Sequence, residues 1–227
     1  LYTDVSHLTA DPALTTDMEH VFVHLASQSK LPRLRKLWFA PFYLHRNLIA
    51  RIDALGSAAS QGKDARIVVK MNSLTDEALI HSLMRAGRNG VKIDLIVRGA
   101  CMLPAQVPGH TDNICVRSVI GRFLEHSRVF YFREGEVEEL YLSSADWMNR
   151  NMVRRVEVAW PVTDPVLRQR LVDECLVAYL HDGVDSWELG ADGAYTSNRK
   201  VGRSKAHGAQ AALMARYADN AKSRDGA

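Results

Sequence analysis

The chain has 227 residues, 47% hydrophobic and 24% charged, an ordinary composition for one large globular domain or one and a half typical ones. Its formal net charge of +3 and pI near 8.8 fit an anionic partner without requiring one. Three widely spaced cysteines argue against a disulfide framework or zinc site, and the sequence shows no membrane span or signal peptide, so we predict a cytoplasmic protein. Because Leu1–Asp4 lacks an initiator Met, we expect an excised piece of a longer protein.

Apolar periodicity predicts alternating helices and strands in the first half of the chain. In order they are a helix over 15–29, a strand over 37–40, a helix over 42–59, a strand over 66–71, a helix from 75 to about 89 and a strand over 91–97. Thr75 is the expected N-cap of the third helix, ahead of an acidic first turn. The helical crossover between the last two strands predicts that they run parallel.

Strand patterns recur in the second half, at 116–120, 126–132, 139–142 and 156–162. Asp164-Pro165 then opens a helix, with the N-cap followed by proline. Residues 183–205 are polar and glycine-rich, so we expect a long surface loop there, followed by a short helix near 209–217. The alternation of helices and strands predicts an α/β fold.

Polar side chains follow both strands of the predicted strand-helix-strand unit. Asn72 comes after the first strand, and Arg98 and Gly99 come after the second. Ligands of open α/β sheets bind beyond the carboxyl ends of the strands. We therefore predict that Asn72 and Arg98 share one rim, where Gly99 allows a close backbone approach to a ligand. Lys70 could face either side of its strand.

His126 and Arg128 enter the apolar run that predicts the strand over 126–132. Side chains two residues apart on a strand point the same way, so the imidazole and guanidinium should share a face. Ser143 and Ser144 follow the next strand and should lie near them. Histidine can act as nucleophile, acid or base toward phosphorus, and arginine binds phosphate oxygens. The pattern favours a phosphoryl-handling site, although a single histidine at a strand start is more often structural.

Several nearby residues have a structural alternative. Glu125 could orient the His126 ring or be solvated, and we favour solvation. Asp146 could cap a turn or hold a basic side chain, and we favour the cap. Arg150 belongs either to a basic patch or to a solvated face. His20 and His24 have helical spacing but no third ligand, so we assign no metal to them.

Five segments together resemble the bacterial type-1 polyphosphate kinase family. They are Leu1–Asp4, Lys70–Leu74, Leu95–Cys101, Arg122–Arg128 and Leu142–Met148. Their order and spacing match the family across residues 1 to about 182, and the combination is specific where each segment alone would be weak. The resemblance implies an α/β, phospholipase D-like fold with a mixed or parallel sheet flanked by helices. Residues 1–182 would form the second of two facing catalytic domains, with 1–64 as its linking helical segment and 183–227 as a terminal loop and basic helix.

The family's activity is the reversible transfer of the terminal phosphate of ATP to inorganic polyphosphate through a phosphohistidine, with magnesium. By the resemblance, Tyr2 would contact the adenine nucleotide, whereas Arg98 and His126 would contact its phosphates. His126 would also act as a second catalytic histidine that donates or accepts a proton. Polyphosphate contacts are further predicted at Asn72, Arg122, Arg128, Ser143, Ser144 and Arg150.

The phosphorylated histidine and the magnesium ligands of the family are expected upstream of Leu1, so we predict no metal site in this chain. The chain alone is expected to be inactive or very weak. Its expected partners are ATP or ADP, polyphosphate and the preceding domains of the same enzyme, which would form a homo-oligomer. No nucleic acid partner is expected, and the enzyme would be cytoplasmic with peripheral membrane association.

Two other functions remain open from the residues. A phospholipase D-like phosphodiesterase would need His-x-Lys, whereas this chain has His126-x-Arg128, so that function is disfavoured. A non-catalytic module that binds nucleotides or polyanions is the second alternative. Release of nucleotides or choline from diesters would support the phosphodiesterase, and binding of ATP or polyphosphate without turnover would support the module.

Overall fold

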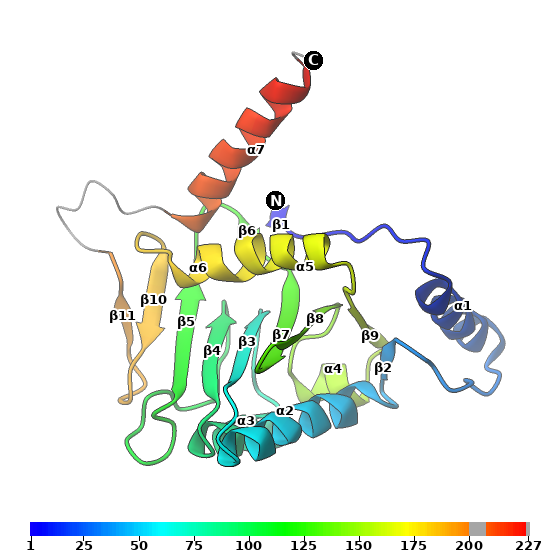
Figure 1. The fold of residues 1–227 in the computed structure, drawn as a ribbon, viewed down its shortest axis with the longest axis horizontal. Coiled ribbons are helices and arrows are strands. Elements are labelled where there is room, and N and C mark those ends of the chain that lie inside the picture. Colours follow the sequence, from blue (N-terminus) through cyan, green and yellow to red (C-terminus); the bar gives the residue numbers. More distant parts are fainter. Residues whose placement is uncertain (200–207, 226–227) are drawn as a thin grey trace.

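The computed structural model describes residues 1–199 and 208–225, with side chains described up to residue 219. Its strands are β1 Tyr2–Thr3, β2 Trp38–Ala40, β3 Ala65–Met71, β4 Lys92–Val97, β5 Ile114–Val119, β6 Leu124–Glu125, β7 Arg128–Glu134, β8 Val137–Ser143, β9 Glu157–Pro161, β10 Ser186–Leu189 and β11 Tyr195–Ser197. Within these residues, a nine-stranded sheet has the order β11-β10-β5-β4-β3-β7-β8-β9-β2 (Figure 1). Strands β3, β4 and β5 run parallel, and the other neighbours run antiparallel.

Helices cover both faces of this mixed sheet, which confirms the predicted α/β class (Figure 1). They are α1 Pro12–Ser27, α2 Leu44–Ser60, α3 Glu77–Arg88, α4 Asn149–Val153, α5 Pro165–Leu171, the π-helical turn η1 Val172–Val177, α6 Ala178–Leu180 and α7 Ala209–Asp225. Helices α2 and α3 pack on one face, η1 and α6 pack on the other, and α7 extends away from the body (Figure 1).

The alternation of side chains along β3 assigns each residue to one face. Ile67 and Val69 pack in the core under α2 and α3, whereas Val68 packs with η1 and α6. Lys70 is two residues after Val68 and so points to the η1 side, where its side chain is buried. The open question about the face of Lys70 is thereby answered, and a buried ammonium on that face needs a partner.

A small parallel ladder between β1 and β6 lies apart from the main sheet (Figure 1). Tyr2 pairs with Leu124, and Thr3 pairs with Glu125. The ladder carries the first residues of the chain to the segment that ends at His126. Two parts of the sequence that are far apart are thus placed at the same rim.

Four expectations about the elements were wrong. Asp76, not Thr75, caps α3, because its carboxylate accepts the Leu79 N–H at 3.0 Å. The strand expected from His126 begins at Arg128. The surface loop expected from residue 183 contains β10 and β11, because β10 pairs with the exposed edge of β5; its residues 200–205 lie outside the described part. Helix α7 runs to Asp225, beyond the short helix expected near 209–217.

The expected division of the chain stays a prediction. Within the expected linking segment over 1–64, strand β2 pairs with β9 and helix α2 packs on the main sheet.

Candidate active site

His126 follows β6 at the rim where β3 and β4 end. Its Nδ1 atom lies 2.7 Å from Oδ2 of Asp4, and the His126 side chain is 38% exposed. Because a carboxylate can only accept a hydrogen bond, the neutral ring carries its proton on Nδ1 and its lone pair on Nε2. The backbone N–H of His126 donates to the Thr3 carbonyl at 3.1 Å. Nε2 is therefore the ring nitrogen that can exchange a proton with a ligand.

Arg128 joins His126 to Asp146. Its Nε and Nη2 atoms donate to the two carboxylate oxygens of Asp146 at 3.2 and 3.1 Å. Its Nη1 atom lies 3.3 Å from Nδ1 and 3.2 Å from Nε2 of His126. The two ring nitrogens point in different directions in the ring plane, so one Nη1 atom cannot bond both in that plane. The near-equal distances therefore mean that the guanidinium packs on the face of the imidazole ring. The two side chains meet as expected, but not as successive outward residues of one strand.

Arg98 and Asn72 lie on the same rim, as the strand-helix-strand pattern predicts. Arg98 Nε donates to the Glu125 carbonyl at 2.9 Å and to Asn72 Oδ1 at 3.3 Å. The Asn72 N–H donates to Asp146 at 2.8 Å. A Cβ atom added to Gly99 would lie 2.9 Å from the Asn72 carbonyl oxygen, so this glycine lets the two strand ends approach each other.

Tyr2 completes the group. Its ring meets the His126 ring edge-on, with centroids 5.1 Å apart, and Tyr2 is 66% exposed. The β1–β6 ladder produces this contact. We call the resulting set of side chains the rim cluster: Tyr2, Asp4, Asn72, Arg98, His126, Arg128 and Asp146. It gathers an oriented imidazole, two guanidiniums and an exposed aromatic ring.

Residues 37–210 match the family model described as polyphosphate kinase C-terminal domain 2. The chain belongs to this family. Over 218 residues, or 96% of its length, the chain is 47% identical to a polyphosphate kinase of Pseudomonas aeruginosa, of which it spans 31%. The crystal structure of polyphosphate kinase from Porphyromonas gingivalis aligns with a TM-score of 0.88 and 33% identity, covering 95% of this chain and 33% of that one. A phospholipase D family member, Nuc from Salmonella typhimurium, aligns at 13% identity and a TM-score of 0.43, covering 61% of this chain and 88% of that one.

The chain thus spans about a third of the length of the polyphosphate kinases that it matches. The polyphosphate kinase family expected from the sequence is thus confirmed.

The other predicted polyphosphate contacts are Arg122 before β6, Ser143 and Ser144 at the end of β8 and just after it, and Arg150 on α4. Arg122 is exposed, and its guanidinium lies 5.4 Å from the centre of the Phe123 ring. Ser143 Oγ donates to the Val158 carbonyl at 2.9 Å, and Ser144 Oγ donates to Glu157. Arg150 is exposed on α4. The two hydroxyls therefore already donate to β9, whereas both arginines are open to solvent.

Glu125 is buried, so the expectation that it is solvated was wrong. Lys70 Nζ donates to its carboxylate at 2.6 Å, and the Lys70 ammonium lies 3.8 Å from the centre of the Tyr179 ring. Thr3 Oγ1 donates at 2.7 Å and Tyr179 Oη at 3.0 Å. Gln210 Nε2 donates as well. The carboxylate is thus bonded to side chains from four separate segments of the chain.

The sequence did not predict the partners of two carboxylates in the rim cluster, those of Asp146 and Asp4. Asp146 holds the Arg128 guanidinium, so the turn cap that we favoured was the wrong alternative. Asp4 lies in a segment that carries the family resemblance, but its role as the partner of His126 was not predicted. No spacing rule could show that role, because 122 positions separate the two residues.

Among the described side chains, in residues 1–199 and 208–219, no group of three or more His, Cys, Asp or Glu could hold a metal ion. No helix within residues 1–199 and 208–225 is both long and apolar enough to cross a membrane.

Proposed function

We propose that this chain is the second of two facing catalytic domains of a polyphosphate kinase. The longer enzyme would transfer the terminal phosphate of ATP to polyphosphate, reversibly and through a phosphohistidine contributed by the preceding domain. Family membership supports this proposal. The observation that carries it is the His126 imidazole, which Asp4 orients against Arg128, while Arg98 bonds the carbonyl of the preceding residue Glu125.

The rim cluster has the groups that phosphoryl transfer needs. Such reactions require neutralisation and alignment of the phosphate oxygens more than covalent chemistry from the protein. Arg98 and Arg128 would neutralise phosphate charge, and both are held by acceptors that fix the direction of their guanidiniums. His126 Nε2 would donate a proton to a phosphate oxygen or accept one, according to the direction of transfer. The exposed ring of Tyr2 would contact the adenine.

Polyphosphate would bind to the cationic rim around this cluster. Arg122 and Arg150 are the strongest of the proposed contacts, because both are exposed and a guanidinium can pair with two phosphate oxygens at once. Arg128 would contribute only its Nη1 atom, since its Nε and Nη2 atoms donate to Asp146. Asn72, Ser143 and Ser144 would contribute polar contacts, although each serine hydroxyl would have to give up its hydrogen bond to β9. A polymer with this charge density should bind less tightly as salt concentration rises.

Magnesium does not fit the carboxylates of the rim cluster. Asp4 is paired with His126, and Asp146 is paired with Arg128, so neither has a free set of oxygens. We place the magnesium ligands in the preceding domain and derive no step from magnesium here. Cytoplasmic location, peripheral membrane association and homo-oligomerisation of the longer enzyme stay predictions.

The test is His126→Ala in the polyphosphate kinase that contains this chain. ATP-dependent synthesis of polyphosphate should fall by at least about 10²-fold, because general acid-base catalysis contributes about that much. His110→Ala is the matched control, since His110 is exposed in a turn outside the rim cluster. Circular dichroism should show that both variants fold. Near-normal synthesis by His126→Ala would refute the role of this histidine.

A further inference from the structure

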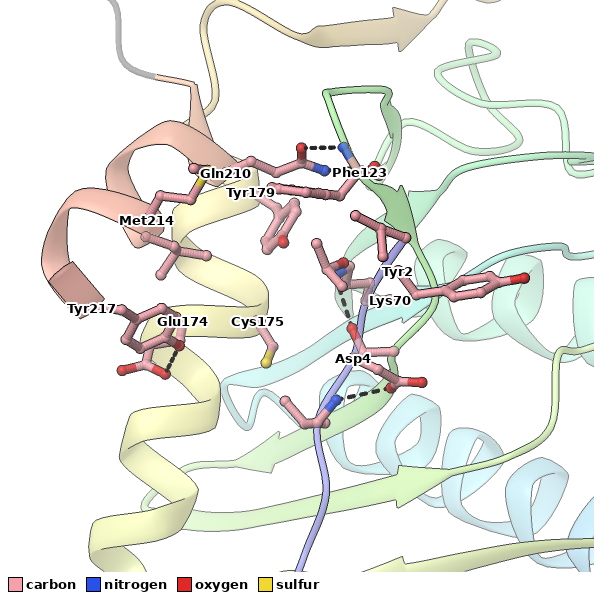
Figure 2. A pocket seen from close by; sticks show the side chains of 15 residues that line it. Tyr2, Asp4, Lys70, Phe123, Glu174, Cys175, Tyr179, Gln210, Met214 and Tyr217 are labelled. Atoms are coloured by element: carbon pink, nitrogen blue, oxygen red, sulfur yellow. Dashed lines mark hydrogen bonds between the residues drawn. The ribbon is translucent and has the colours of Figure 1, made fainter. Parts of the chain in front are cut away.

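Gln210, in the first turn of α7, pairs with the backbone of the segment that leads to His126. Its Oε1 atom accepts the Phe123 N–H at 2.9 Å, and its Nε2 atom donates to the Phe123 carbonyl at 2.8 Å. One side-chain amide therefore satisfies both backbone groups of Phe123, as a neighbouring strand would. Figure 2 shows the amide bonded to the Phe123 backbone nitrogen, at a pocket that residues of α7 and η1 also line. Gln210 is only 5% exposed, so the two bonds are shielded from water.

Gly121 leaves the space that the Gln210 amide occupies. A Cβ atom added to Gly121 would lie 2.6 Å from Oε1 and 2.7 Å from Cδ of Gln210. Real Cβ atoms do not approach other heavy atoms so closely, and any larger residue at position 121 would push the amide away. The two positions, one on the loop before β6 and one on α7, are thus fitted to each other.

The same amide also bonds to Glu125. Gln210 Nε2 donates to the Glu125 carboxylate, which in turn accepts from Lys70, Thr3 and Tyr179. Burial and the neighbouring Glu125 carboxylate raise the pKa of Tyr179, so its hydroxyl stays protonated and continues to donate. A buried carboxylate with this many donors has a single low-energy position.

The segment over 121–126 is held on its other side by the first residues of the chain. The Leu124 N–H donates to the Leu1 carbonyl at 3.1 Å, and the His126 N–H donates to the Thr3 carbonyl at 3.1 Å. The segment therefore lies between β1 and the Gln210 amide, and among the described strands β6 pairs with β1 and with no strand of the main sheet. The main sheet reaches β6 through the side chains of Lys70 and Arg98, which bond to Glu125. The positions of Tyr2 and His126 therefore depend on the β1 ladder and on side-chain contacts such as those of Gln210.

We infer that Gln210 is a positioning residue, which aligns His126 for phosphoryl transfer by holding Phe123 and Glu125. The inference rests on the proposed function of His126. The hydrogen bonds of the Gln210 amide go to Phe123 and Glu125 rather than to the rim cluster, so it acts through the segment over 121–126. In this way the first turn of helix α7 helps to fix the position of the His126 side chain.

The first experiment is Gln210→Met in the polyphosphate kinase that contains this chain. Methionine keeps the volume of the side chain but removes all three hydrogen bonds. We expect kcat to fall by about 10- to 100-fold, since a misplacement of about 1 Å costs that much. Gly121→Ala should produce a similar loss by displacing the amide, and it decides the question if Gln210→Met does not fold. Gln169→Met, an exposed helical position, is the matched control and should leave kcat unchanged.

The second experiment reads the position of His126 without activity. In the 227-residue chain, Gln210→Met should speed hydrogen exchange of the Leu124 and His126 amides and shift the ¹⁵N signals of the His126 ring. Unchanged exchange and ring signals would overturn the inference, even if kcat fell. If His126→Ala retains full synthesis, the proposed function fails, and faster exchange would still show that Gln210 holds the segment.

Discussion

Asp4 and His126 are 122 positions apart in the chain, yet the carboxylate oxygen Oδ2 and the ring nitrogen Nδ1 lie 2.7 Å apart. The contact depends on the β1–β6 ladder, which carries the first residues of the chain to the rim. It selects the tautomer with the lone pair on Nε2, the nitrogen that could exchange a proton with a phosphate. In the proposed kinase, the carboxylate of Asp4 therefore decides which nitrogen of His126 is useful.

Asp4→Asn should lower turnover of the polyphosphate kinase by about 10²- to 10⁴-fold, because an amide N–H facing Nδ1 favours the wrong tautomer. Nucleotide affinity should change little, since the change leaves Arg98 and Tyr2 in place. Steady-state kinetics and calorimetry with ATP measure the two effects. Asp112→Asn, at an exposed loop position, is the control. Normal turnover by Asp4→Asn would show that the pair has no catalytic role.

Arg98→Lys should weaken ATP binding by about tenfold or more, although the charge is kept. A lysine ammonium cannot bond the Glu125 carbonyl and direct a second nitrogen at a phosphate in the fixed geometry of the guanidinium. A charged hydrogen bond contributes about 1.5–3 kcal/mol, which corresponds to this change in affinity. Calorimetry with ATP on the 227-residue chain measures it. Arg88→Lys, near the end of α3, provides the control, and equal affinity in both variants would contradict the prediction.

Asp17→Asn should lower the free energy of unfolding by about 2–4 kcal/mol, because the amide keeps only one of the two acceptor oxygens and loses the negative charge. The Asp17 carboxylate is buried and accepts the backbone N–H groups of Arg35, Lys36 and Leu37 at 2.6–3.0 Å. An amide group would place its own donors against these groups. Urea unfolding measures the loss, and Glu19→Gln on the exposed face of α1 should change stability little. A loss below about 0.5 kcal/mol for Asp17→Asn would be contrary to this account.

Asp76→Ala should lower the free energy of unfolding by about 1–2 kcal/mol at pH 7, the usual cost of losing an N-cap. Burial alone would raise the pKa of Asp76, but hydrogen bonds from His45 and the Leu79 N–H outweigh it and leave the pKa below its ordinary value. A lowered folded pKa means that the charged carboxylate stabilises the fold above its unfolded pKa of about 4. This contribution is lost as the pH falls through the folded pKa.

The difference between the native chain and Asp76→Ala should therefore shrink as the pH falls below about 4. Urea unfolding at a series of pH values gives the two curves. Glu77→Ala, at an exposed position in the same helical turn, provides the comparison. A difference that stays constant down to pH 2.5 would show that the carboxylate charge contributes nothing.

The unit of β3, α3 and β4 could be predicted from sequence because its signals are local. Alternation, a helical stripe and a short crossover define two parallel strands, and parallel strands end at one edge. The neighbouring positions of Asn72 and Arg98 follow directly, and the structure has them in contact. By contrast, β10 could not be predicted, because the short segment Ser186–Leu189 becomes a strand by pairing with the edge of β5 and with β11.

The burial of Glu125 depends on residues that are remote in the sequence. A glutamate beside a histidine most often lies in water, since an ionised carboxylate is costly to bury without partners. Here its partners come from Lys70, Tyr179 and Gln210, at separations of 55, 54 and 85 positions. Such separations carry no pattern that a single sequence can show.

The sequence by itself determined the family, the α/β class and the residue types of the proposed phosphate site, because motifs and periodicity are local properties of the chain. Only the tertiary structure decided that Asp4 orients His126, that Arg128 bridges to Asp146 and that Gln210 supports the loop before His126. These contacts arise where separate segments meet, and the cost of burying a carboxylate or an amide without partners selects that meeting point.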